Sequence, residues 1–328
     1  MPSMKLPRRQ FLRLAAGAAA LPAVPRIARA QAYPTRPARI IVGYPPGGVN
    51  STVARFVAQS LQERLVQPFI VEYRPGAANN LATEAVVRAL GDGYTLLLAD
   101  SANAINATLY DKLNFNFIRD IAPVATIMAV PLVFEVNPSV PARTVSEFIS
   151  YAKANPGKLN MASPGIGTSN HVAGALFKIM TGIDMVDVQY RGGAPALTDL
   201  MGGQVQAYFG QLPASIEYIR ARKLRALAVT TPTRAEILPE LPTVAEAVPG
   251  FEASNWYGIG APKSTPADII AKLNKEINEA LADPKLKARL SYLGGVVLTH
   301  TPGDFGKFIA EDTVKWAKVI RAANIKTE

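Results

Sequence analysis

Two adjacent patterns near the start of the chain, ARIIVGY (38–44) and TVARFVAQSLQERL (52–65), decide the fold class. The first is a short apolar run rich in β-branched residues and predicts a buried strand. The second has the apolar spacing of an amphipathic helix. A strand at 69–73, a helix at 80–90 and a strand at 94–99 follow. This βαβαβ order predicts an α/β fold in which a mostly parallel sheet is flanked by helices.

A second series of alternating strands and helices occupies residues 144–230. Two extended segments connect it to the rest of the chain: 121–137, which is interrupted at Pro131, and 251–262. We therefore expect two lobes that close on a ligand in the cleft between them, with the last helices returning to cover the first lobe. The predicted boundaries are 31–130 with 256–328 for lobe 1, and 131–255 for lobe 2.

The N-terminus has the features of an export signal. The segment RRQFL (8–12) resembles a twin-arginine signal, and ARA (28–30) fits a cleavage site. The apolar run at 11–24 is far shorter than the roughly 20 residues that a membrane span needs. We expect residues 1–30 to be a cleaved signal peptide, and the mature protein to be soluble in the periplasm.

Composition excludes several kinds of chemistry. The chain has no cysteine, so disulfides, a thiolate nucleophile and cysteine-ligated metals are excluded. Residues 1–30 hold six basic residues and no acid, so cleavage reduces the formal net charge from +10 to +4. That excess forms no basic stripe of the kind that nucleic-acid-binding proteins carry.

The loop YPPGG (44–48) joins the first predicted strand to the first helix. The start of a helix has unpaired N–H groups and partial positive charge, and it therefore favours an anion. Gly47 and Gly48 allow the backbone to approach a ligand closely, and Asn50 or Ser51 can cap the helix and face the cleft. The loop lacks the lysine of a phosphate-binding loop and the G-x-G-x-x-G of a dinucleotide fold. An ordinary capped turn is the alternative interpretation.

A second loop of this type, SPGIGTSNH (163–171), also lies between a strand and a helix. Gly167 loosens the turn, and Thr168 or Ser169 can be the N-cap. If the two loops face each other, each helix start can hold one carboxylate of a di-acid, because amides and hydroxyls in a dry cleft stabilise the charge without a fixed cation.

Three more positions are candidates for the lining of the cleft. Asn79 belongs to the loop RPGAANN (74–80), Ser101 follows the third strand, and Gln211 ends a strand of the second series. Ligands of open α/β sheets bind outside the carboxyl ends of the strands, where all three lie. Ordinary turns and caps explain these residues equally well.

Enzyme chemistry has little support in the sequence. His171 and His300 are the only histidines, and the acids show no metal-binding spacing. The chain has no G-x-S-x-G segment of the kind that presents a hydrolase serine. We therefore predict no catalytic residues, no metal and no cofactor.

Over nearly the whole mature chain, the sequence resembles the periplasmic solute-binding proteins of tripartite tricarboxylate transporters, the TctC or Bug type. The matching stretches include YPTRPARIIVGYPPGG, GTSNHVAGALFKIMTGIDMVDVQYRGGAPALTDLMGGQVQAYF and KWAKVIRAANIK. The resemblance implies a two-lobed Venus flytrap fold and a receptor that hands a small carboxylate to a membrane permease pair. It also implies that one ligand carboxylate is held between the loops matching 44–51 and 163–169. His171 matches a family histidine with a structural role.

Departures from the family pattern bear on the ligand. The family commonly has aspartate where this chain has Ser51, and often has aspartate where this chain has Gly210. Losing these acids removes a partner for a ligand ammonium group and a repulsion against an extra ligand carboxylate. We therefore expect a carboxylate without an amino group: a di- or tricarboxylate, or an aromatic acid.

The sequence thus predicts a monomeric periplasmic receptor that binds a small carboxylate, not nucleic acid, and works with large and small permease subunits in the membrane. A sensory protein that presents its ligand to a membrane receptor is an alternative, and a periplasmic hydrolase is a weaker one. The predicted ligand-binding residues are Tyr44, Gly47, Gly48, Asn50, Ser51, Asn79, Ser101, Ser163, Gly167, Thr168, Ser169 and Gln211.

Overall fold

A computed structural model describes residues 33–110 and 112–327, so the predicted export signal lies outside the described residues. Residues from Arg36 onward form one compact unit. Its first elements are β1 (Ala38–Val42), α2 (Val49–Leu65), β2 (Phe69–Tyr73), α3 (Asn80–Val87), β3 (Thr95–Asp100), α4 (Ser101–Leu109), α5 (Phe117–Asp120) and β4 (Ile121–Val136). None of the helices in the described ranges is long and apolar enough to cross a membrane.

The remaining elements follow the predicted alternation closely. They are α6 (Val145–Ala154), β5 (Asn160–Ser163), α7 (Ser169–Thr181), β6 (Val186–Gln189), α8 (Gly193–Met201), β7 (Ala207–Gln211), α9 (Leu212–Arg220), β8 (Arg225–Val229), the 3-10 turn η1 (Val244–Glu246), β9 (Ser254–Pro262), α10 (Ala267–Ala282), α11 (Pro284–Tyr292), β10 (Val296–Val297) and α12 (Pro302–Ala322). The predicted α/β class is confirmed.

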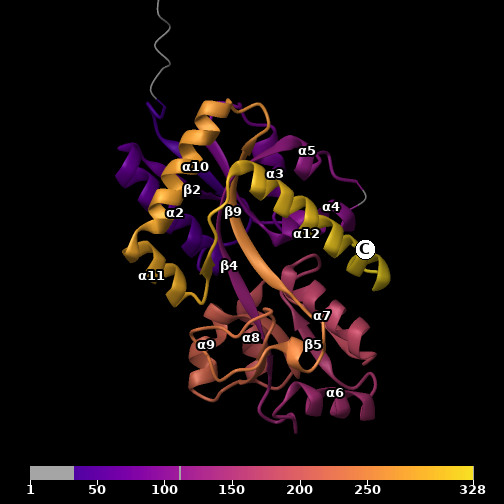
Figure 1. Cartoon of the computed structure of the whole chain (residues 1–328). Coiled ribbons are helices and arrows are strands. Elements are labelled where there is room, and N and C mark those ends of the chain that lie inside the picture. Colours follow the sequence, from indigo (N-terminus) through magenta and orange to yellow (C-terminus); the bar gives the residue numbers. More distant parts are fainter. Residues whose placement is uncertain (1–32, 111, 328) are drawn as a thin grey trace, which may run out of the picture. The chain divides into compact units, whose positions relative to one another are not determined.

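The strands form two sheets that share β4. In sheet A, β1 pairs in parallel with β2 and β3, and β9 joins β3 to β4 by antiparallel pairing. In sheet B, β5 pairs in parallel with β6 and β7, and β4 runs antiparallel to β7 and β8. Each sheet therefore has the parallel part that the sequence predicts, together with antiparallel connecting strands (Figure 1).

Pro131 marks the point where β4 changes partners. Its last partner in sheet A is Ser254 on β9, and Leu132 begins the pairing with β7. We expected Pro131 to interrupt the extended segment, and that prediction is wrong, because β4 continues through it. Proline has no N–H to donate to a ladder. At the junction between two sheets that missing donor costs little.

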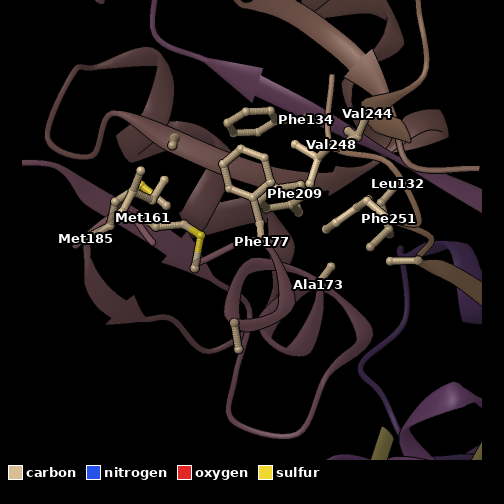
Figure 2. Close-up of a cluster of buried hydrophobic side chains, with 14 of the residues drawn as sticks. Leu132, Phe134, Met161, Ala173, Phe177, Met185, Phe209, Val244, Val248 and Phe251 are labelled. Carbon is tan, nitrogen blue, oxygen red and sulfur yellow. The ribbon is translucent and has the colours of Figure 1, made fainter. Parts of the chain in front are cut away.

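The core of sheet B is built around aromatic side chains. Phe134 of β4 stacks on Phe209 of β7 with ring centroids 4.5 Å apart, and Phe177 of α7 lies 4.9 Å from Phe134. Figure 2 shows these rings together with Phe251, from the segment that leads into β9. Alternate residues of a strand point to the same face of the sheet, so residues of β4 and β7 form a single buried cluster with one face of α7.

α12 belongs to two cores. Phe305 and Ile309, in its first half, pack in the cluster of sheet A that contains Trp256. Trp316 and Ile320, in its second half, pack in the cluster of sheet B. We expected the last helices to cover the first lobe; α12 does pack on sheet A, and in addition it reaches into the core of sheet B.

Candidate functional site

The first glycine loop lies where predicted, between β1 and α2. α2 begins at Val49, three residues earlier than the predicted helix, with Gly48 as its N-cap. Glycine offers no side chain to the first N–H groups of the helix, which therefore stay open to a ligand. Gly47 and Gly48 are exposed, and Gly47 has φ +101°, a conformation that favours glycine. Backbone in this loop is presented to its surroundings.

Asn50 and Ser51 lie inside the first turn of α2, so the prediction that either caps the helix is wrong. Both side chains are buried. The Asn50 amide donates to Asp100 Oδ2 at 2.9 Å, and the Ser51 hydroxyl lies 2.6 Å from the hydroxyl of Tyr73. α2 begins about one turn earlier than predicted, and this places both side chains against sheet A.

Asp100 is the centre of a polar network that our sequence analysis did not identify. It is almost fully buried at the end of β3 and accepts hydrogen bonds from Tyr44, Asn50 and Asn79. Burial raises the pKa of this carboxyl to about 6, although those donors oppose the shift. Burial raises the pKa of the Tyr44 hydroxyl well above its ordinary value, and the neighbouring Asp100 carboxyl raises it further. Asp100 therefore holds the first loop and the loop 74–80 together.

Asn79 and Ser101 have structural hydrogen bonds in this network. The Asn79 amide donates to Leu98 O at 3.2 Å and to Asn103 Oδ1 at 3.0 Å. The Ser101 hydroxyl accepts from the backbone N–H of Trp256 at 2.9 Å. Both side chains are fully buried, so their hydrogen bonds fix the elements around the loops.

The second glycine loop begins where β5 ends. Thr168 is the N-cap of α7, as predicted, and its hydroxyl accepts from the His171 N–H at 3.3 Å. The Ser163 hydroxyl donates to Gly165 O at 3.2 Å. Ser169 follows in the first turn of α7 and is buried. These short-range hydrogen bonds shape the loop from within.

α4 connects the two glycine loops. Asp100, its N-cap, contacts Asn50 beside the first loop. Near its other end, Asn106 faces the second loop, because a Cβ at Gly167 would lie 2.7 Å from Asn106 Oδ1. Asn106 lies six positions after Asp100, about 9 Å along the helix at the usual rise. The two loops thus lie on either side of one short helix.

Several side-chain amide atoms near α4 make no hydrogen bond with the described residues. Within the described residues, Asn79 Oδ1, Asn80 Nδ2 and Asn106 Oδ1 are buried and have no hydrogen-bond partner. Buried polar atoms of this kind are normally satisfied, often by ordered water. The region beside α4 can therefore accept further hydrogen-bonding groups.

Sheet B contributes Gln211 and a carboxyl that we did not predict. Gln211 Oε1 accepts from the Tyr257 hydroxyl at 3.2 Å, which links β7 to β9. The space beside Gly210 is filled by the carboxyl of Glu135. Our expectation that Gly210 leaves this position without an acid is therefore wrong, because β4 supplies one from the neighbouring strand.

The arrangement suits binding better than bond cleavage. Two helix starts, several amides and hydroxyls, and two buried carboxyls make up the site. In residues 33–110 and 112–327, no three His, Cys, Asp or Glu side chains are placed to hold a metal ion. N–H groups and amide dipoles at helix starts stabilise an anion.

Comparison with known proteins gives one consistent result. The profile described as "Tripartite tricarboxylate transporter family receptor" (TctC) matches residues 53–325. Protein BugT of Bordetella pertussis (strain Tohama I) is 37% identical over 300 residues, which cover 90% of this chain and 92% of BugT.

Solved structures agree in fold and sequence. Rpa4515 of R. palustris with adipate has a TM-score of 0.85 and 34% identity, covering 90% of this chain and 99% of that one. The periplasmic binding protein BugD has a TM-score of 0.83 and 32% identity, covering 90% and 100%. MatC of Rhodopseudomonas palustris with bound malate has a TM-score of 0.81 and 30% identity, covering 88% and 100%.

Proposed function

Because this chain belongs to the tripartite tricarboxylate transporter family of receptors, with the periplasmic-binding-protein fold and no enzymatic role, we propose that it captures a di- or tricarboxylate or an aromatic acid and delivers it to a membrane transporter. The pair of glycine loops, one on each sheet and each at the start of a helix, carries this proposal. The adipate of Rpa4515 and the malate of MatC are small carboxylates of the kind that such loops suit.

We assign residues 31–130 and 256–328 to one lobe and 131–255 to the other, with the ligand in a cleft between them. The change of strand partner between Pro131 and Leu132, and the start of β9 at Ser254, support this division. The first loop, with Tyr44, Gly47 and Gly48, and the second, with Thr168 and Ser169, are its proposed contacts with the ligand. Asn50, Asn79 and Ser101 support the loops through their buried hydrogen bonds.

The ligand is proposed to lack an amino group. An ammonium group needs an ionised partner, and Ser51, where the family resemblance implies aspartate, bonds to Tyr73. Succinate and glutarate, tested by thermal shift and calorimetry beside adipate and malate, are expected to raise the Tm more than aspartate and glutamate. Tighter binding of the amino acids contradicts this ligand class, and no stabilisation by any carboxylate contradicts the function.

In the same titrations, Gly48→Ala is expected to keep the wild-type Tm and to weaken binding of the best carboxylate by about tenfold. Apart from its neighbours along the chain, no described residue has an atom within 4 Å of a Cβ at Gly48, whose φ is −85°, so the methyl group has room except where a ligand binds. The control is Gly303→Ala at the exposed start of α12, which should leave the affinity unchanged. Equal affinities of the two variants would remove the first loop from the site.

We propose that the chain reaches the periplasm by the twin-arginine route and acts there as a monomer beside large and small permease subunits. The motif at Arg8-Arg9 and the site before Gln31 support this. Mass spectrometry of the exported protein is expected to show Gln31 as the first residue, and changing both arginines to lysine should stop export. Export of the lysine variant contradicts the route. If the neighbouring genes encode a sensor kinase instead of permeases, signalling replaces transport.

A further inference from the structure

Glu135 is a fully buried acid in the middle of sheet B. It lies on β4 between Tyr208 of β7 and Ala226 of β8, next to a register shift in the β4–β8 pairing. Such irregularities re-aim side chains and occur often beside functional sites. A buried glutamate is uncommon unless it is paired with a cation.

Gly210 makes room for this carboxyl. A Cβ at Gly210 would collide with Glu135 Oε1, and would lie 2.9 Å from the Ser215 hydroxyl. That hydroxyl, from α9, donates to Glu135 Oε1 at 2.7 Å. Glu135 Oε2 has no hydrogen-bond partner within the part of the chain that the structure describes. The Glu135 carboxyl therefore lies beside Gly210, near the end of β7. Gln211 and the start of α9 follow Gly210 directly in the chain.

No cation compensates Glu135 among the described residues. Of the elements packed on it, β7 contributes the Tyr208 phenol, α9 the Ser215 hydroxyl, and β8 the nearby Arg225. The Arg225 guanidinium donates instead to the carbonyl oxygens of Val140 and Ala142. Burial consequently raises the pKa of Glu135 to about 8, against the hydrogen bond from Ser215. At pH 7 this carboxyl is mostly neutral.

We propose that Glu135 determines the charge of the sheet B half of the ligand site, so that a carboxylate ligand binds when Glu135 is protonated and is repelled when it is ionised. The inference rests on the proposed function. A neutral acid beside Gly210 and Gln211 neither attracts an ammonium group nor repels a carboxylate. Its ionised form places a negative charge in a low-dielectric region next to an anion, and the repulsion there is much less screened than in water.

The test compares adipate and malate binding by calorimetry at pH 7 and pH 9. Both ligands, and Asp100 with its pKa of about 6, are ionised at both pH values. Wild-type affinity is expected to fall on the order of tenfold at pH 9, in proportion to the Coulomb repulsion of one buried charge. Glu135→Gln keeps an acceptor for Ser215 and should change less than twofold. Glu217→Gln, on the exposed side of the same helix α9, is the matched control and should keep the wild-type pH dependence.

A second measurement needs no ligand. Because the folded pKa of Glu135 lies above the ordinary value, the folded state binds a proton that the unfolded chain releases above about pH 4.5. Stability is therefore highest below that pH and falls as the pH rises toward 8. The Tm of the wild type is expected to fall by several degrees over this range relative to Glu135→Gln.

The outcomes separate the two proposals. Binding at pH 7 that weakens equally in the wild type and Glu135→Gln overturns the role of Glu135 and leaves the carboxylate receptor intact. Equal pH dependence of the two Tm values overturns the raised protonation on which that role depends. Failure of every carboxylate to bind at either pH overturns the proposed function, and the role of Glu135 with it.

Discussion

Replacing Phe134 by alanine is expected to lower the free energy of unfolding by about 3–5 kcal/mol, the usual cost of deleting a fully buried phenylalanine. Phe134 is completely buried and contacts three rings. Its centroid lies 4.5 Å from that of Phe209, and 4.9 Å from those of Phe148 and Phe177. The three surrounding rings come from three different elements, α6, α7 and β7, so they cannot collapse into the cavity together.

Urea denaturation followed by circular dichroism measures this loss through the transition midpoint and its slope. Tyr292→Ala is the control, because Tyr292 is also aromatic but 68% exposed, and it should change stability by about 0.5 kcal/mol or less. A loss below about 1 kcal/mol for Phe134→Ala would show that the aromatic cluster is not closely packed.

Gly43→Ala is expected to destabilise the protein by about 3 kcal/mol, at the upper end for overpacking a core. A Cβ there would lie 2.5 Å from the Cα of Asn79. A backbone atom cannot move aside as a flexible side chain can. Asn79 is also fixed by its own hydrogen bond to Leu98 O and has a φ of 76°. The methyl group therefore forces apart β1 and the loop 74–80.

Gly48→Ala, five residues later in the same loop, is the matched control for stability. The same urea titration should show a change within about 0.5 kcal/mol, because the added methyl has no neighbour among the described atoms. If Gly43→Ala is as stable as Gly48→Ala, the close approach of Asn79 to β1 is not present in solution.

Local patterns in the sequence predicted most of the fold. Hydrophobic periodicity located the strands of both sheets except the two-residue β10, and the long helices α2, α7, α10 and α12. α4 was not predicted, because SANAINATL has a weak apolar stripe and several asparagines, which favour turns in isolation. It forms because tertiary contacts pair their amide N–H groups: Asn103 Nδ2 donates to the Thr83 hydroxyl and Asn106 Nδ2 to Ala78 O, both at 2.7 Å.

Site prediction succeeded where the chemistry was local. Thr168 caps α7 through a hydrogen bond to a residue three places later, a pattern that is visible in sequence. It failed at Asn50 and Ser51, because a helix boundary can shift by several residues when tertiary contacts favour the extra turn. Val49 extends α2, and the Asn50 amide then meets Asp100, fifty residues away.

The two buried acids could not have been assigned from the sequence. In the sequence, Asp100 is one polar residue after an apolar strand, and Glu135 is one polar residue within an apolar segment. Their importance comes from partners that only the fold brings close: Tyr44 and Asn79 for Asp100, and Ser215 and Gly210 for Glu135. The family pattern at position 210 alone predicts no acid there. Because β4 pairs with β7, Glu135 of β4 lies beside Gly210.

The division of α12 between two hydrophobic clusters also fixes the order of assembly during synthesis. The strands of sheet B are complete once Val229 has been made, yet their core also requires Trp316 and Ile320. A growing chain that ends at Val229 therefore has the strands of sheet B but lacks two apolar side chains of their core. Contacts between such distant residues form late. The core of sheet B is consequently completed only by a helix that is made about ninety residues after its last strand.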